Sequence, residues 1–113
     1  MDEGLLARLS TAEAAYDETL TQLADPDVLG DQNRYREVST RHAELKPIVE
    51  AYRQYTAATD EVADATELRD AESDTDMVAY LEETIASKSA EMAELEQRLR
   101  VLLVPKDPDD EKD

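Results

Sequence analysis

The feature that most constrains the fold is a heptad pattern in the last third of the chain. Large side chains recur there at alternating spacings of three and four residues: Val78, Leu81, Ile85, Lys88, Met92, Leu95, Leu99 and Leu102. Only Lys88 is not apolar, and its aliphatic stem can cover apolar surface while its ammonium group reaches water. A stripe this narrow predicts a helix that packs along a partner helix as a coiled coil. It favours an elongated all-α domain over a globule.

A longer helical pattern precedes this one. Asp31 is a suitable N-cap, and the pattern after it predicts a helix to Ala71, about 40 residues or roughly 60 Å long. Its apolar stripe contains Tyr35, Val38, His42, Leu45, Val49 and Tyr52, flanked by Ile48, Tyr55 and Val62. Pro47 lies inside this helix, removes one backbone hydrogen bond and clashes with the carbonyl group four residues back. We therefore expect a kink between Ala43 and Pro47.

The N-terminal region predicts a first helix over residues 3–24. Its stripe again uses spacings of three and four: Leu5, Leu9, Ala12, Tyr16 and Leu23. Ser10 and Glu13 resemble a capping box, which would allow a later start. The early start is favoured because Leu5 and Leu9 are in phase with the rest of the stripe.

Two short segments separate the three predicted helices. Asp25–Gly30 contains an Asp-Pro pair and a glycine, and Ser73–Asp76 is rich in capping residues. We expect the second and third helices to form a long antiparallel hairpin with the first helix near its base. Ala57–Thr75 has few large apolar groups and predicts a weakly anchored, mobile hairpin tip. Val104–Pro105 ends the third helix because proline cannot continue one.

Composition and charge limit the possible functions. The 113 residues fit one domain, and the absence of cysteine excludes disulfides and thiol chemistry. The formal net charge of −17 argues against nucleic-acid binding, since phosphates are bound by lysine and arginine. The acidic N-terminus does not resemble a signal peptide, and no segment approaches the roughly 20 apolar residues of a membrane span. We expect a cytoplasmic protein without membrane contact.

Several acidic residues are candidates for cation binding. Asp25, Asp27 and Gly30 match part of a calcium loop, but Leu29 and Arg36 occupy positions that must supply oxygen ligands. A turn is therefore the better interpretation. The C-terminal acidic residues form a second candidate set, comprising Asp107, Asp109, Asp110 and Glu111. Nothing in the sequence holds them in a coordination geometry, so a solvated linker is favoured.

His42 is the single histidine of the chain. It has no cysteine with which to bind zinc or to form a nucleophilic pair. Because it falls on the apolar stripe, we predict a histidine packed in the interior or at its edge. No glycine-rich phosphate loop and no convergent polar set occur, so we predict no catalytic, cofactor-binding or metal-binding residue and no enzymatic activity.

One local basic cluster lies near the start of the second predicted helix, and it contains Arg34, Arg36, Arg41 and Lys46. Pairing with neighbouring acids such as Asp31 and Glu37 is the simpler interpretation. The functional alternative is a contact with an acidic partner or with a neighbouring domain.

The C-terminal segment 102–113, LLVPKDPDDEKD, carries a resemblance to a known family. It resembles the segment that closes the N-terminal helical domain of bacterial class-I peptide chain release factors for UAA and UAG codons. Residues 23–28, 31–39 and 45–49 also resemble that family, and the resemblance runs from about Leu5 through most of the chain. The PKDPDD element at 105–110 is its most specific part.

The resemblance implies a division of the chain into a helical domain, residues 1–104, and an acidic linker, residues 105–113. The linker would lead to codon-recognition and peptidyl-tRNA hydrolysis domains, whose Pro-x-Thr and Gly-Gly-Gln motifs do not occur here. This segment would then be an accessory module for positioning and protein contacts. Its implied partners are the ribosome, at the protein stalk base rather than at RNA, the GTPase release factor, and the methyltransferase that modifies the catalytic glutamine.

The alternative is a free-standing acidic hairpin that acts as an adaptor or a chaperone-like coiled coil. The heptads fit both interpretations equally well. Residues 105–110 and 31–37 favour the release-factor family.

Overall fold

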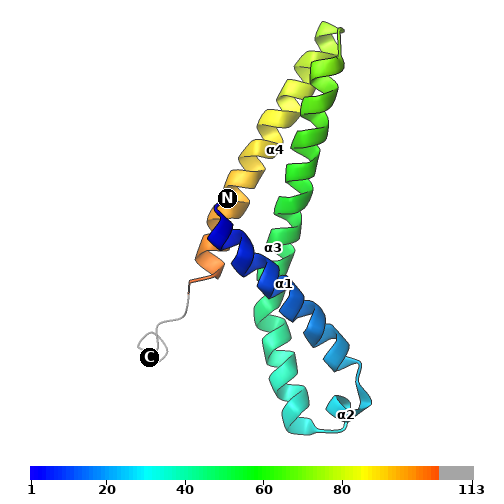
Figure 1. The fold of residues 1–113 in the computed structure, drawn as a ribbon, viewed down its shortest axis with the longest axis vertical. Coiled ribbons are helices and arrows are strands. Elements are labelled where there is room, and N and C mark those ends of the chain that lie inside the picture. Colours follow the sequence, from blue (N-terminus) through cyan, green and yellow to red (C-terminus); the bar gives the residue numbers. More distant parts are fainter. Residues whose placement is uncertain (105–113) are drawn as a thin grey trace.

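The computed structural model describes residues 1–104. In chain order its helices are α1 (Glu3–Leu23), α2 (Pro26–Leu29), α3 (Gln32–Ala71) and α4 (Thr75–Leu102). Helices α3 and α4 form an antiparallel hairpin, α1 crosses α3, and α2 lies in the connection between them (Figure 1). The radius of gyration is 19.4 Å and the extents are 62 × 37 × 22 Å, whereas a compact domain of about 100 residues has a radius near 13 Å. The predicted elongated all-α architecture is confirmed.

Every described helix begins at an aspartate whose carboxylate accepts a backbone amide hydrogen. The bonds are Leu5 N to Asp2 (2.7 Å), Asp27 N to Asp25 (2.9 Å), Asn33 N to Asp31 (3.1 Å) and Asp76 N to Asp74 (2.9 Å). These caps satisfy amide groups that the first helical turn leaves without partners. The prediction of Asp31 as a cap is confirmed. Helix α1 begins at Glu3 rather than at the capping-box sequence of Ser10.

The connection between α1 and α3 is more ordered than the sequence indicated. We predicted a turn over Asp25–Gly30, and the structure places the short helix α2 there. Pro26 occupies the first turn of α2, where its missing amide hydrogen costs nothing. The Val28 side chain, which is fully buried, anchors α2 to the rest of the domain.

The hairpin interface is asymmetric in the size of its side chains. All the predicted stripe positions of α4 are buried or half-buried, which confirms the heptad interpretation. On α3 the buried positions at the same period are alanines: Ala51, Ala58 and Ala65, which are 2%, 3% and 5% exposed. Small side chains let the two helix axes approach closely. We call this row of three residues the alanine seam.

The structure corrects one expectation for α3 and refines another. Tyr35, which we placed on the apolar stripe, is 44% exposed. The stretch after Ala57 is helical as far as Ala71, as predicted, and it buries two alanines of the seam although it has few large apolar groups. The mobility of the hairpin tip stays a prediction.

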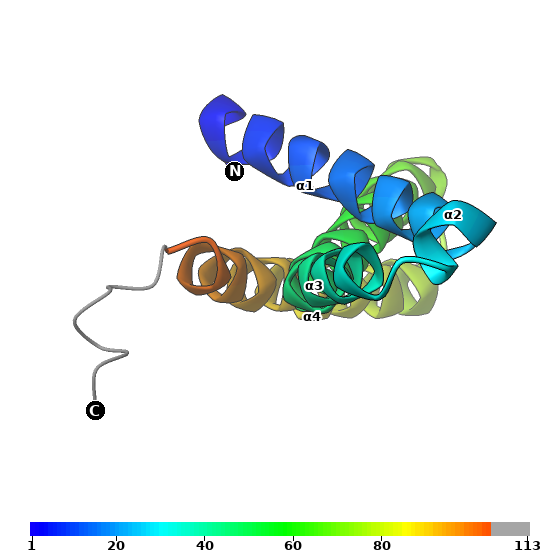
Figure 2. The same cartoon turned by 90° about the horizontal axis from the view of Figure 1, so that it is seen from below.

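Helix α1 packs where the hairpin ends, as predicted. Leu5 and Leu9 of α1 join residues of both other long helices in the core cluster, which comprises Leu5, Leu9, Ala51, Leu95 and Leu99. Seen from below, α1 lies against one side of the α3–α4 pair (Figure 2). The Arg8 guanidinium donates to the Leu103 carbonyl group at 2.9 Å, which links α1 to the residue that caps α4.

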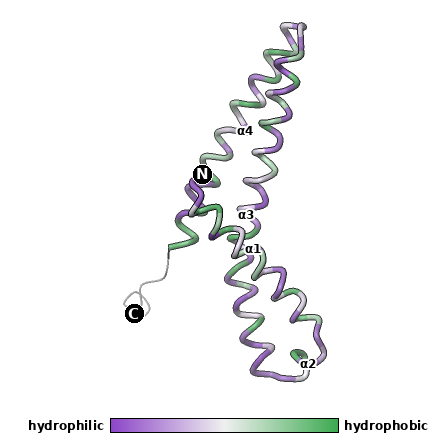
Figure 3. The backbone as a smooth tube through the Cα atoms, viewed as in Figure 1, coloured by the Kyte–Doolittle hydropathy of each residue, from purple (hydrophilic) through white to green (hydrophobic). Residues whose placement is uncertain are grey.

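Helix α3 has 40 residues and α4 has 28, so the first part of α3 extends beyond the end of α4. This part is accompanied by α1 and α2 instead (Figure 1). Pro47 lies within α3, and the helix changes direction in the region that α1 crosses, in agreement with the predicted kink. Hydrophobic residues gather at this crossing and at the end of α4, while the far end of the hairpin is mainly hydrophilic (Figure 3).

Candidate functional site

The single histidine lies in a contact between α1 and α3. The His42 ring stacks on Tyr16 with centroids 4.8 Å apart and planes inclined by 19°. Its Nδ1 atom is 3.3 Å from Thr19 Oγ1, and that hydroxyl group donates its one hydrogen to the Tyr16 carbonyl at 2.6 Å. Thr19 must therefore accept from His42, which assigns the proton of neutral His42 to Nδ1. The prediction of a packed histidine is confirmed, and this contact satisfies the buried Thr19 hydroxyl.

Arg53 makes a second α1–α3 contact that sequence analysis missed. Its Nε donates to Glu13 at 2.8 Å and its Nη2 to Asp17 at 3.2 Å. The guanidinium carbon lies 5.7 Å from the centroid of the Tyr16 ring. The hydrogen bond to Glu13, followed by that to Asp17, raises the pKa of Arg53. Because these groups are exposed, the contact orients α1 more than it stabilises the domain.

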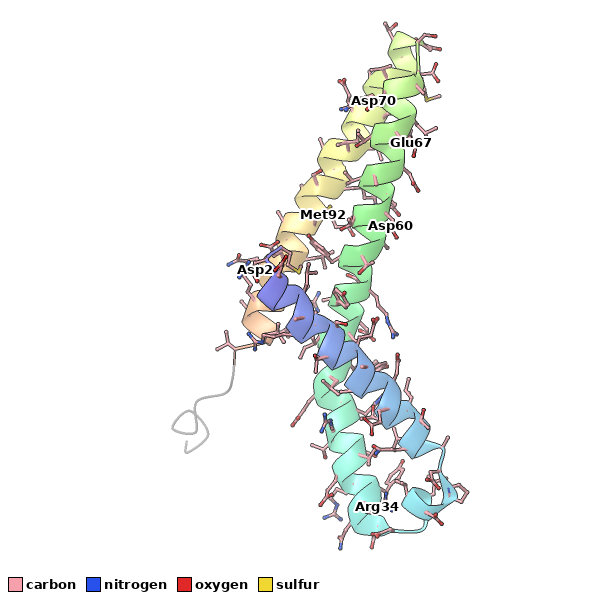
Figure 4. All side chains as sticks on the ribbon, viewed as in Figure 1. Asp2, Arg34, Asp60, Glu67, Asp70 and Met92 are labelled. Carbon is pink, nitrogen blue, oxygen red and sulfur yellow. The ribbon has the colours of Figure 1, made fainter. Side chains whose placement is uncertain are left out.

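A small charge network joins the start of α1 to α4. Arg100 Nη2 is 3.2 Å from Glu96 and 3.6 Å from Asp2, and Asp2 lies beside α4 in Figure 4. The hydrogen bond from the Leu5 amide is the largest cause of the lowered pKa of Asp2. The hydrogen bond from Arg100 is the largest cause of the lowered pKa of Glu96.

Lys88 occupies the α4 stripe in the manner expected from its aliphatic stem. Its ammonium group is 3.0 Å from Glu61 on α3 and 3.2 Å from Glu91 on α4. The hydrogen bond to Glu61, and then that to Glu91, raises the pKa of Lys88. The Glu61 contact crosses the hairpin and therefore favours one register of α3 against α4.

The predicted basic cluster lies on the part of α3 that extends beyond α4. All four of its side chains, Arg34, Arg36, Arg41 and Lys46, are exposed. Within residues 1–104, only Lys46 has a carboxylate in reach, that of Glu50 at 4.0 Å. Within the described residues, the predicted pairing with neighbouring acids is thus wrong for the three arginines and holds for Lys46 alone. Asp31 is used as a helix cap instead, and Arg34 lies toward the α2 end of α3 (Figure 4).

One member of this cluster borders a hollow of about 420 Å³, which we call the α1–α3 groove. Its lining comprises Ala7, Arg8, Thr11, Ala12, Ala15, Arg41, Leu45 and Leu103. The α1 side offers mainly small residues, while Leu45 and Leu103 add apolar surface. The lining includes two arginines and no carboxylate, which is unusual in a chain with a net charge of −17.

The hairpin arm beyond the core cluster carries the opposite charge. Between residues 60 and 83 the acidic residues are Asp60, Glu61, Asp64, Glu67, Asp70, Glu72, Asp74, Asp76, Glu82 and Glu83. The one basic residue in this stretch is Arg69, which is 3.3 Å from Asp70. Asp60, Glu67 and Asp70 mark this arm in Figure 4. A strongly acidic arm attracts basic partners and repels phosphate backbones.

The Asp25 carboxylate accepts from the Asp27 amide as the N-cap of α2, so it serves as a helix cap in the segment that resembled part of a calcium loop. Residues 1–104 hold no group of three or more side chains suited to a metal ion, and no helix in that range is apolar and long enough to cross a membrane. The proposed acidic linker, with Asp107, Asp109, Asp110 and Glu111, lies outside the described residues.

Comparison with known proteins gives a consistent result. The family model of the PCRF domain matches residues 12–113. Curated relatives with the name "Peptide chain release factor 1" include those of Lactobacillus johnsonii (38% identical over 109 residues), Listeria welshimeri (40% over 105) and Staphylococcus aureus (38% over 106). These alignments cover 96%, 93% and 94% of this chain. The chain spans about 30% of the length of these relatives. No solved structure matches it.

Proposed function

Because this chain belongs to the PCRF domain family, we propose that it serves translation termination as the N-terminal domain of a peptide chain release factor. The alignment to relatives of that name over 96% of the chain carries the proposal. The match includes α2 and the basic cluster as well as the heptads, so it favours this function over a free-standing adaptor or chaperone-like hairpin.

The domain itself contributes positioning and protein contacts. Neither Gly-Gly-Gln nor Pro-x-Thr occurs in the 113 residues, so peptide release and the reading of UAA and UAG fall to the rest of the parent protein. The described surfaces support this division, since they comprise a charged arm and a groove. The domain works in the bacterial cytoplasm, where translation takes place.

The acidic arm is the contact for the ribosome in this proposal. Its charge favours a basic protein, such as one at the stalk base, and disfavours ribosomal RNA. The elongated hairpin holds the arm away from the core cluster, so a partner can bind it without disturbing α1. The GTPase release factor and the glutamine methyltransferase are further partners of the parent protein.

A chimeric release factor tests the proposal. Residues 1–113 replace the corresponding third of the Staphylococcus aureus relative, and peptide release is measured on ribosomes stalled at UAA. We expect the chimera to release peptide and the isolated chain to release none. Release by the isolated chain, or a folded chimera that binds ribosomes normally but is inactive, contradicts the modular function.

A matched pair of variants tests the role of the arm. Asp60→Lys with Glu67→Lys in the chimera should weaken ribosome binding, whereas Glu3→Lys with Glu18→Lys, an equal charge change at exposed α1 positions, should not. Equal binding by both pairs would remove the arm from the proposed contact. The native reading frame beyond codon 113 tests codon specificity, since it should encode Gly-Gly-Gln and Pro-x-Thr.

A further inference from the structure

The α1–α3 groove has the chemistry of a site for an acidic peptide. Arg41 forms no ion pair with residues 1–104, although the domain offers many carboxylates. Arg8 donates one hydrogen bond to the Leu103 carbonyl at 2.9 Å, and a guanidinium group has five N–H donors. Both arginines therefore keep donors for carboxylates, and Leu45 supplies an apolar surface beside them.

In the sequence, an acidic segment begins soon after a residue that lines this groove. Leu103 both caps α4 and lines the groove, so residue 105 follows two positions after a lining residue. The sequence from Pro105 to Asp113 contains five carboxylates and two lysines. Asp107 is four positions beyond Leu103, which corresponds to a reach of roughly 14 Å. Two prolines in nine residues lower the entropy that ordering such a segment costs.

We infer that the α1–α3 groove binds the acidic segment 105–113 of the same chain, with carboxylates bound by Arg41 and Arg8. The inference goes beyond the proposed function and does not depend on it. Binding of this segment would set the direction in which the polypeptide leaves the helical domain.

The tether makes the chain's own segment the favoured occupant. A short linker gives an effective concentration in the millimolar range, which an acidic peptide from another protein would have to match. Repulsion from the acidic arm is screened beyond about 10 Å at 0.1 M salt. A free polyphosphate such as RNA has no tether, and the net negative charge of the whole domain repels it.

Paramagnetic relaxation in the full chain tests the inference, because the sequence has no cysteine to block specific labelling. A nitroxide is attached through Lys112→Cys, which leaves all five carboxylates in place. We expect broadening of the Thr11 and Ala15 amides in the groove. Adding Arg41→Glu should lower the docked population by about two- to fivefold for each exposed ion pair lost.

The control is Arg98→Glu on α4. Arg98 is exposed, forms no ion pair within residues 1–104 and does not line the groove, so its charge reversal should leave the broadening unchanged. About 1 M salt, at which the Debye length is roughly 3 Å, should relieve it. Circular dichroism confirms that each variant is folded. Equal broadening in the Arg41 and Arg98 variants, or displacement by a short RNA, would overturn the inference.

Discussion

Replacing Ala58 with leucine tests whether the alanine seam holds α3 and α4 close together. Ala58 is 3% exposed and lies between two other buried alanines at the same heptad period. Leucine adds three carbon atoms to a position where α4 leaves almost no open surface. The helices must then separate, or the leucine must adopt an unfavourable rotamer.

The magnitude follows from the cost of overpacking. Extra methylene groups in a packed core destabilise by about 1–3 kcal/mol, and we expect about 2 kcal/mol for Ala58→Leu. For a domain of this size that corresponds to a fall in Tm of roughly 10 °C. The matched control is Ala57→Leu, since Ala57 is exposed on the same helix turn. Alanine and leucine have similar helix propensities, so the control should stay within about 0.5 kcal/mol.

The assay is urea unfolding followed by circular dichroism at 222 nm, with sedimentation to confirm that both variants keep the association state of the parent. If Ala58→Leu is as stable as Ala57→Leu, the side chain has room, and the close approach of the two helices is refuted. A stable Ala58→Leu with a changed association state would also contradict the packing, because the leucine would then be accommodated outside the intact hairpin.

Three further predictions concern other contacts. Leu9→Ala should lower the free energy of unfolding by about 3 kcal/mol, because the Leu9 side chain is fully buried. The control is Leu20→Ala on the same helix, where the side chain is 45% exposed and the loss should be under about 1 kcal/mol. Equal urea midpoints for the two variants would contradict the core cluster. Lys88→Leu should raise Tm by completing the stripe, and Lys88→Glu should lower it by opposing Glu61 and Glu91. A fall in Tm for Lys88→Leu would show instead that the ion pairs outweigh the gain in apolar packing. The pKa values of Asp2 and Glu96 are lowered in the folded domain, so unfolding at acid pH takes up protons. The two carboxylates therefore stabilise the folded domain fully above their ordinary pKa values of 3.8 and 4.5. This stabilisation is lost as the pH falls through the folded pKa values. Asp2→Asn with Glu96→Gln should therefore flatten the acid side of the Tm–pH curve, and an unchanged slope would exclude this network as its cause.

The sequence alone determined where most helices begin and end. Aspartate caps, two breaks and Pro105 are local signals, because each acts on backbone groups within one helical turn. The heptads of α4 likewise identified its buried face, since large apolar side chains at heptad spacing indicate the buried side of a helix without knowledge of its partner. Helix α2 escaped prediction because four residues carry no periodicity, although buried Val28 anchors them.

Only the tertiary structure decided which alanines are buried. Ala51, Ala58 and Ala65 do not differ in character from exposed alanines such as Ala57, and their role depends on how closely α4 approaches. The same holds for contacts between distant positions. Arg53 meets Glu13 across 40 residues, and no local pattern encodes that pairing.

The groove is the clearest case of this limit. Arg8, Arg41 and Leu103 are far apart in sequence, and they meet because α1 crosses α3 at the place where α4 ends. The sequence showed a basic cluster on one helix and predicted that neighbouring acids would neutralise it. Side chains of one helix interact mainly at spacings of three and four, whereas a groove forms where separate helices converge. The local pattern of charges therefore identified the cluster, and the packing of three helices decided what Arg41 can bind.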